Sequence, residues 1–238
     1  MSNWFNYRKR CLRSIRKRIE RLIQVNRLKA EVIKYSKKLN TTNLSALRSG
    51  NISVRTKEKG MDGFYITPSG RKYSSLKTNE IIFVSLKGVF DKKKGKPSSE
   101  WRFHQDIYVN KKDAKAIVHA HSTCASAVST HQKNIPAFHY MVAVAGGEDI
   151  KCSKYATFGT KNLSRNIIKA LKNRTACLIA NHGQVAFGEN LEKTFELAQE
   201  IENICQQYIN AIRIGIPKIL SKKEMKIVLG KFKNYKKG

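Results

Sequence analysis

The chain has 238 residues, of which 41% are hydrophobic, so its composition allows a substantial core and excludes a wholly disordered protein. Its 47 Lys and Arg against 17 Asp and Glu give a formal net charge of +30. Such a charge suits a polyanionic partner or an anionic substrate, but lysines dispersed over the whole chain are also typical of a solvated surface. We therefore do not expect nucleic acid as a partner.

The cysteines and the apolar segments allow an expectation about the cellular location of the protein. The five cysteines are far apart and form no CxxC pair, which favours a reducing cytosol. They are Cys11, Cys124, Cys152, Cys177 and Cys205. No segment approaches the roughly 20 apolar residues of a membrane-spanning helix. We expect a cytoplasmic protein without a membrane partner.

Residues 1–29 differ from the rest of the chain. Basic and apolar residues alternate there at helical spacing, which predicts a basic amphipathic helix. The apolar members are Leu12, Ile15, Ile19, Leu22 and Ile23, and eight basic residues lie among them: Arg8, Lys9, Arg10, Arg13, Arg16, Lys17, Arg18 and Arg21. A mitochondrial presequence would share these arginines, but a surface helix that extends the following domain is the favoured interpretation.

Helices and strands are expected to mix through the remaining chain, residues 30–238. In its first part, residues 30–39 are expected to continue the N-terminal helix or to form a second one. A turn and strand over 49–54, strands at 64–67 and 81–86, a polar loop over 91–97 and a helix over 100–109 follow. The second part is expected to contain a strand over 116–121, a helix over 123–130, an apolar segment over 137–145, a helix over 163–172, a strand over 176–180, and helices over 191–214 and 222–235. This order predicts one α/β domain, with strand directions left open.

Three histidines have contexts typical of metal ligands. His119 and His121 are alternate residues of a predicted strand, so their imidazoles project from one face. His182 follows another apolar strand, directly before a glycine. Three neutral imidazoles with an open fourth position are typical of a catalytic zinc site. The other histidines are expected to be ordinary helix, loop and core residues: His104, His131 and His139.

Glu100 and several turns are candidates for the rest of a site. Glu100 is either an ordinary first-turn glutamate, favoured by the helix dipole, or a fourth ligand or general base beside a metal. Two serines precede it at a predicted helix start, where free N–H groups can hold a phosphate. Two glycine-containing turns can add N–H donors. The candidate phosphate-binding residues are Gly50, Asn51, Ser69, Gly70, Ser98 and Ser99.

Several segments occur in an order that resembles a known family. They are Ser-Ser-Glu-Trp-Arg-Phe-His (98–104), His-Ala-His (119–121), Ile-Pro-Ala-Phe-His-Tyr-Met (135–141), Ala-Gly-Gly (145–147), Tyr-Ala-Thr-Phe-Gly-Thr (155–160) and Asn-His-Gly (181–183). The segments 50–54, 66–70 and 231–235 continue the match. Over roughly residues 30–238 the chain resembles the class II aldolase/adducin family, most closely its L-fuculose-1-phosphate aldolase branch.

The resemblance implies a fold and an assembly. It implies a three-layer α/β/α sandwich around a mixed, mostly antiparallel sheet, and a homotetramer with active sites between subunits. The implied activity is carbon–carbon cleavage of a ketose 1-phosphate, such as L-fuculose 1-phosphate, into dihydroxyacetone phosphate and a short aldehyde such as L-lactaldehyde. Residues 30–238 would then be the catalytic domain.

Site roles follow from the same resemblance. His119, His121, His182 and Glu100 would hold one Zn²⁺ per chain, with Glu100 also acting as the base. The six glycine, asparagine and serine residues named above would hold the substrate phosphate. Tyr140 would donate a proton across the subunit interface, and Phe158 and Tyr235 would lie near the aldehyde.

The chain departs from the family pattern at Arg48, where a small hydroxyl residue is common, and in the extension over 1–29. An arginine there would either grip phosphate or block the pocket. Other enzymes of this fold stay open as alternatives: a 5-deoxypentulose-phosphate aldolase, a methylthioribulose-phosphate dehydratase or a 4-epimerase. Glu100 argues against the epimerase, which typically has Asp there. A non-catalytic polyanion-binding protein is the remote alternative, because adducin-type relatives lack the metal ligands.

Overall fold

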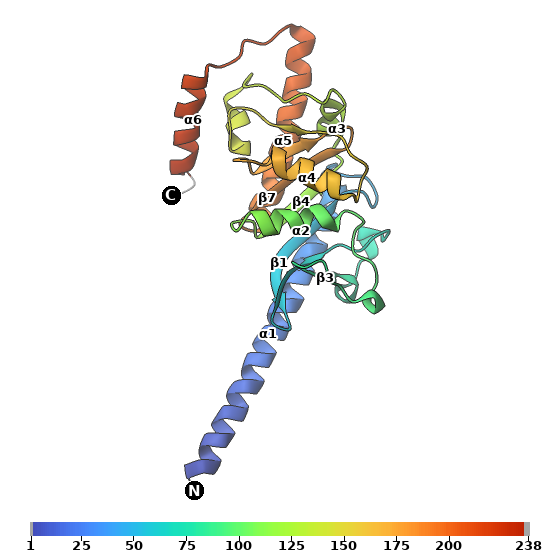
Figure 1. Cartoon of the computed structure of the whole chain (residues 1–238), viewed down its shortest axis with the longest axis vertical. Helices are drawn as coiled ribbons and strands as arrows, with labels where there is room; N and C mark the ends of the chain where they lie inside the picture. Colours follow the sequence, from blue (N-terminus) through green and yellow to red (C-terminus); the bar gives the residue numbers. More distant parts are fainter. Residues whose placement is uncertain (1, 236–238) are drawn as a thin grey trace.

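The centre of the molecule is one seven-stranded sheet (Figure 1). The computed structural model describes the backbone of residues 2–235 and the side chains of residues 12, 13 and 16–233. The strands are β1 (Asn51–Glu58), β2 (Met61–Ile66), β3 (Ile82–Ser85), β4 (Ala116–Ala120), β5 (Cys152–Ser153), β6 (Ala176–Ile179) and β7 (Gly183–Gly188). Their order is β3-β2-β1-β4-β7-β6-β5, and only the β5–β6 pair is parallel.

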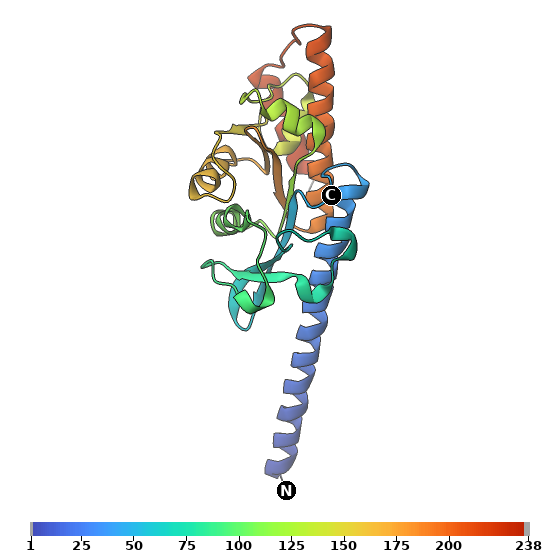
Figure 2. The same ribbon diagram turned by 90° about the vertical axis from the view of Figure 1, so that its right-hand side faces the viewer.

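Helices cover both faces of the sheet, which gives three layers (Figure 2). One face carries α1 (Ser2–Thr41), α3 (Thr123–Ser129) and α5 (Leu191–Ile214); the other carries α2 (Trp101–Asn110) and α4 (Lys161–Ala170). The C-terminal helix α6 (Lys222–Tyr235) packs on the 3-10 helix η4 (Tyr140–Ala145). Three further 3-10 helices occupy loops: η1 (Tyr73–Ser75), η2 (Thr78–Glu80) and η3 (Lys92–Lys94). The expected α/β sandwich with a mostly antiparallel sheet is confirmed.

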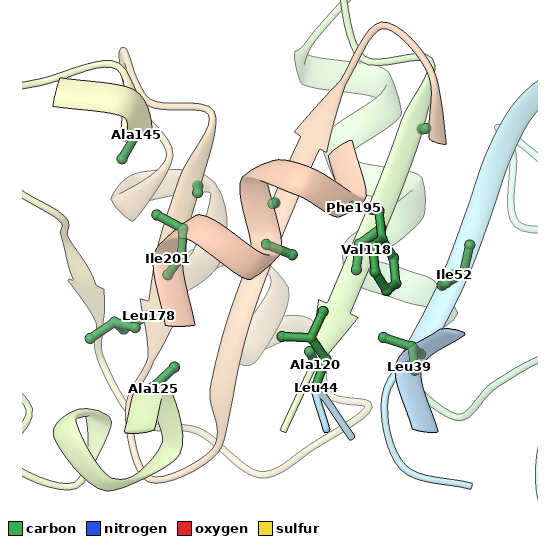
Figure 3. Close-up of a cluster of buried hydrophobic side chains, with 14 of the residues drawn as sticks. Leu39, Leu44, Ile52, Val118, Ala120, Ala125, Ala145, Leu178, Phe195 and Ile201 are labelled. Carbon is green, nitrogen blue, oxygen red and sulfur yellow. The ribbon is translucent and has the colours of Figure 1, made fainter. Parts of the chain in front are cut away.

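Alternation along the central strands separates two hydrophobic cores. On β4, Val118 and Ala120 point into the core beneath α1 and α5, together with Phe195 (Figure 3). Ile117 points the other way, into the core beneath α2 and α4. Successive strand residues face opposite sides, so His119 must also point toward α2. The strand pattern therefore determines which layer receives the candidate metal ligands.

The structure decides between alternatives that the sequence left open and adds elements that were not predicted. Residues 30–39 continue the helix of the N-terminal extension, and the apolar segment over 137–145, for which no element was predicted, contains the 3-10 helix η4. The strands β5 and β7 were not predicted: β5 has only two residues, and β7 begins and ends with glycine, which is weak for strand prediction. Within the described residues no helix is long and apolar enough to cross a membrane.

Helix α1 contributes to the core only in its second half. Its partly or fully buried apolar side chains begin at Val25, and Leu39 is completely buried. Deleting residues 2–23 should therefore lower the thermal unfolding midpoint by less than about 3 °C, since little apolar area is lost. Leu39→Ala should lower the free energy of unfolding by about 2–5 kcal/mol because it leaves a cavity in the core. Thermal unfolding followed by circular dichroism measures both, and a large loss in the deletion variant would contradict the division of α1.

Candidate metal centre

Neighbouring strand ends bring the three histidines together. His119 is the fourth residue of β4, and His121 follows immediately after that strand. His182 lies in the turn between β6 and β7, and β7 pairs with β4 so that Ala120 lies opposite Gln184. The chain can pass this point because residue 183 is glycine: a Cβ there would lie 2.3 Å from the Ala120 carbonyl oxygen. A tight strand connection thus places His182 beside His121.

Glu100 reaches the same point from the α2 layer. It occupies the N-cap position of α2 and is only 6% exposed. Its Oε2 lies 3.1 Å from His119 Nε2, and its Oε1 lies 3.2 Å from His182 Nε2. His121 Nε2 is 2.9 Å from Nε2 of each of the other two histidines. All four ligand atoms lie within 4.8 Å of one another.

The donor set is suited to a cation. His119 Nδ1 lies 2.7 Å from the Gln184 carbonyl oxygen, so Nδ1 carries the proton and the Nε2 lone pair points into the cluster. A neutral His121 has one Nε2 proton at most and cannot donate to both neighbouring rings. Glu100 Oε1 is buried without a hydrogen bond in the described structure. Three imidazole nitrogens and a carboxylate in this arrangement match the ligands of a catalytic zinc or similar divalent ion.

The electrostatics of the cluster favour the protonation states of His121 and Glu100 that bind a metal. Burial, together with the neighbouring His119 and His182, lowers the pKa of His121 to about 3, although Glu100 acts in the opposite direction. Burial alone would raise the pKa of Glu100, but the neighbouring imidazoles of His119 and His182 outweigh it and hold that pKa well below its usual range. A neutral imidazole and an ionised carboxylate are the forms that bind metals.

A buried series of hydrogen bonds supports Glu100 from behind. The Asn51 amide donates to Glu100 Oε2 at 2.9 Å, and the Asn51 side-chain oxygen contacts His104 Nε2. On the other side of the ring, His104 Nδ1 lies 2.7 Å from Ser53 Oγ, which lies 2.8 Å from the Tyr108 hydroxyl. Because the amide oxygen of Asn51 must accept, His104 carries its proton on Nε2. Every donor in the series then points toward Glu100.

His104 is a residue whose role the sequence analysis missed, since it was expected to be an ordinary helix residue. Burial, and to a lesser extent His119, lowers its pKa to about 3, so it is neutral near pH 7. A signal was present in the sequence. Glu100, His104 and Tyr108 are four residues apart on one helix face, and Asn51 and Ser53 are alternate residues on one strand face.

A cavity of about 490 Å³ opens above Glu100, His121 and His182. All six candidate phosphate-binding residues line it: Gly50, Asn51, Ser69, Gly70, Ser98 and Ser99. Gly50 has φ +76°, and a Cβ there would lie 2.7 Å from the His119 carbonyl oxygen, so the turn beside the metal ligands requires glycine. The metal cluster and the candidate phosphate-binding turns therefore share one cavity.

Arg48 lies on the wall of this cavity and does not fill it. Its Nη1 donates to the Gly70 carbonyl oxygen at 3.0 Å, so the guanidinium bridges two of the candidate phosphate-binding turns. Phe158, expected near the aldehyde, also lines the cavity. Tyr140 is half-exposed and lines a separate cavity with residues of α6, so a single chain does not bring it to the cluster. The side chain of Tyr235 lies outside the described residues.

Comparisons with known proteins identify the family of the chain. Residues 30–209 match the family described as Class II Aldolase and Adducin N-terminal domain. The chain belongs to this family. It is 43% identical to L-fuculose phosphate aldolase of Escherichia coli (strain K12) over 211 residues, which cover 88% of this chain and 96% of that protein. It is equally 43% identical, over 208 residues, to 5-methylthioribulose-1-phosphate/5-deoxyribulose-1-phosphate aldolase of Rhodospirillum rubrum, covering 87% and 92%.

A solved structure confirms that the class II aldolase fold extends over most of the chain. An L-fuculose 1-phosphate aldolase superimposes with a TM-score of 0.81 at 39% identity, covering 87% of this chain and 96% of the other. The resemblance stated from the sequence is confirmed, and so is the expectation of a carbon–carbon lyase. The family match begins at residue 30.

The cluster makes a direct prediction about metal content. The purified protein should retain about one divalent ion per chain after dialysis, and His121→Ala or His182→Ala should lose it, because each removes one of four converging ligands. Inductively coupled plasma mass spectrometry measures the content. His131→Ala, on an exposed loop residue, is the control and should keep the ion. Equal metal content in all variants would contradict the site.

The hydrogen-bond series predicts a loss of metal affinity in His104→Phe. Phenylalanine keeps the ring against Phe103 but removes both nitrogen atoms, so Asn51 loses the partner that orients it toward Glu100. Metal affinity should fall about 10–100-fold, as is typical when a residue supporting a ligand is lost. Competition with a chromophoric chelator measures it, and His104→Gln, which restores an N–H donor, should recover part of the loss. Lower thermal stability with unchanged affinity would assign His104 to packing alone.

Proposed function

We propose that the chain is a metal-dependent aldolase that reversibly cleaves a ketose 1-phosphate into dihydroxyacetone phosphate and a short aldehyde. The observation that carries the proposal is the shared cavity, which is lined both by members of the carboxylate and imidazole cluster and by the candidate phosphate-binding turns. The turns Gly50-Asn51 and Ser69-Gly70, with Ser98 and Ser99, offer N–H and hydroxyl donors to a phosphate. The two 43% identical relatives are named for this class of reaction.

The proposed metal is Zn²⁺, because nitrogen-rich sets with one carboxylate suit it. His119, His121, His182 and Glu100 would hold it, and when bound it supplies Lewis-acid stabilisation of the negative charge that develops beside the ketone during cleavage. Glu100 is the base that we propose moves the proton at the nucleophilic carbon. Its Oε1, free of hydrogen bonds in the described structure, is the oxygen available for that proton.

We propose that Tyr140 protonates the aldehyde oxygen from a neighbouring subunit of a homotetramer. Its half-exposed side chain does not line the cavity that holds the cluster of its own chain, which supports a role in a second chain's site. Phe158 is 64% exposed at the cavity wall and would be covered in such an assembly. A cytoplasmic location is proposed from the four described cysteines, all of which are free.

Two kinds of ketose 1-phosphate, which differ in the aldehyde that they release, are candidate substrates. L-Fuculose 1-phosphate, which would yield L-lactaldehyde, is the first candidate because the chain also superimposes on an L-fuculose 1-phosphate aldolase. A 5-deoxypentulose or methylthioribulose 1-phosphate is the second, since a relative named for those substrates is equally identical. Both candidates share the phosphate and ketone ends and differ only at the aldehyde side.

A panel of ketose 1-phosphates tests the proposal. L-Fuculose 1-phosphate, 5-deoxyribulose 1-phosphate and 5-methylthioribulose 1-phosphate should each be assayed for dihydroxyacetone phosphate, with and without a chelator. At least one should be cleaved, and the chelator should abolish the activity because the cluster then lacks its cation. Full activity in metal-free protein, or no cleavage of any of the three by metal-loaded protein, would contradict the proposal.

Arg48 should contribute to phosphate binding, since its guanidinium lies between the turns that we propose hold the phosphate. Arg48→Ala should raise KM about 10–100-fold, the range for a lost charge-assisted hydrogen bond, with a smaller change in kcat. Lys172→Ala removes the same charge from an exposed residue outside the cavity lining and is the matched control. Equal effects of the two variants would show that only the overall positive field matters.

A further inference from the structure

The first half of α1 extends away from the rest of the molecule (Figures 1 and 2). Every described side chain from Leu12 to Gln24 is exposed, and packing against the body begins at Val25. This segment, residues 12–24, takes no part in the cavity or in either core. Its surface therefore needs an explanation that the proposed aldolase activity does not supply.

One side of this segment is apolar and uncovered. Leu12, Ile19, Leu22 and Ile23 are 58%, 51%, 56% and 63% exposed. Spacings of three, four and seven residues place these side chains on one stripe of a helix. Isolated exposed apolar residues are ordinary, but a continuous exposed stripe marks an interaction surface.

The remaining circumference is strongly basic. Residues 1–29 contain a single acidic residue, Glu20, which pairs with Arg16 at 2.9 Å. Residues 1–29 contain ten basic residues, five of them within residues 12–24: Arg8, Lys9, Arg10, Arg13, Arg16, Lys17, Arg18, Arg21, Arg27 and Lys29. Arg13, Lys17 and Arg21, spaced four residues apart, lie on the side opposite the apolar stripe. The free segment thus combines an apolar stripe with a dense positive charge.

Three kinds of partner account for these features to different degrees. Nucleic acid accounts for the charge but leaves the apolar stripe in water. A second copy of the helix covers the stripe but brings two strongly positive segments together. A membrane surface rich in anionic lipids accounts for both, because the stripe enters the headgroup boundary while lysines and arginines contact lipid phosphates and carboxylates.

We propose that the first half of α1 is a peripheral anchor that lies in the plane of an anionic lipid surface. The helix does not cross the bilayer; it binds by its apolar stripe and its positive charge together. The sequence analysis expected no membrane partner because it searched only for membrane-spanning segments. The uncovered apolar stripe indicates a different way to bind a membrane, at its surface. The positive charge of the segment then attracts it to the lipid surface, and residues 30–238 carry the metal cluster and the cavity.

Vesicle binding by the full-length chain tests the anchor. The protein should co-sediment with phosphatidylcholine vesicles containing about 30% phosphatidylserine and remain free with phosphatidylcholine alone. Ile19→Ser/Leu22→Ser and, separately, Arg13→Gln/Lys17→Gln/Arg21→Gln should each lower the partition coefficient at least about 10-fold. All these side chains are exposed, so thermal unfolding should be unchanged.

A matched control separates local from overall charge. Lys87→Gln/Lys169→Gln/Lys172→Gln removes the same three charges from exposed positions on the body and should change partitioning by less than about 2-fold. Equal loss in the two charge variants, or unchanged partitioning of Ile19→Ser/Leu22→Ser, would overturn the proposal. Salt-sensitive binding to duplex DNA without vesicle binding would overturn it in favour of nucleic acid. A sedimenting mass that falls in Ile19→Ser/Leu22→Ser, again without vesicle binding, would overturn it in favour of a second copy.

Discussion

A carboxylate buried among imidazoles is the constraint on which the site depends. Glu100 is removed from water, and its ionised form is stable there only because positive or hydrogen-bonding groups surround it. The sheet supplies these groups from β4 and the β6–β7 turn, and α2 supplies the carboxylate. A cation held by the same four side chains would satisfy the remaining lone pairs at once. The layers of the fold are arranged so that this convergence occurs at the floor of an open cavity.

Sequence periodicity predicted the parts of the site that depend on a single element. Alternation placed His119 and His121 on one strand face, and the turn glycines that were expected to hold a phosphate line the cavity beside them. Contacts between elements could not be predicted in this way. The hydrogen bond from the Asn51 side chain to Glu100 was not expected, and His104 was left without a role. Both depend on how the α2 layer packs on β1, which is set by tertiary packing and not by either segment alone.

The fold class was predicted correctly from the sequence, and the errors of that prediction concern single strands. The β5 and β7 strands were missed because β5 is very short and β7 begins and ends with glycine. Gly183 is required by the close approach of the Ala120 backbone. Strand direction came from the resemblance, since periodicity is the same in parallel and antiparallel pairs. The continuous helix α1 has two parts: its second half fills the core, whereas residues 1–29 concentrate ten of the 47 Lys and Arg residues beside a single acidic residue.

The central claim is that one cavity holds both a divalent ion and a sugar phosphate. A crystal of the zinc-loaded protein soaked with dihydroxyacetone phosphate, measured at the zinc absorption edge, tests it most directly. The account predicts one anomalous peak per chain among His119, His121 and His182, with the phosphate against Ser69, Gly70, Ser98 and Ser99 in the same cavity. An anomalous peak elsewhere, or a phosphate bound away from these turns, would contradict it.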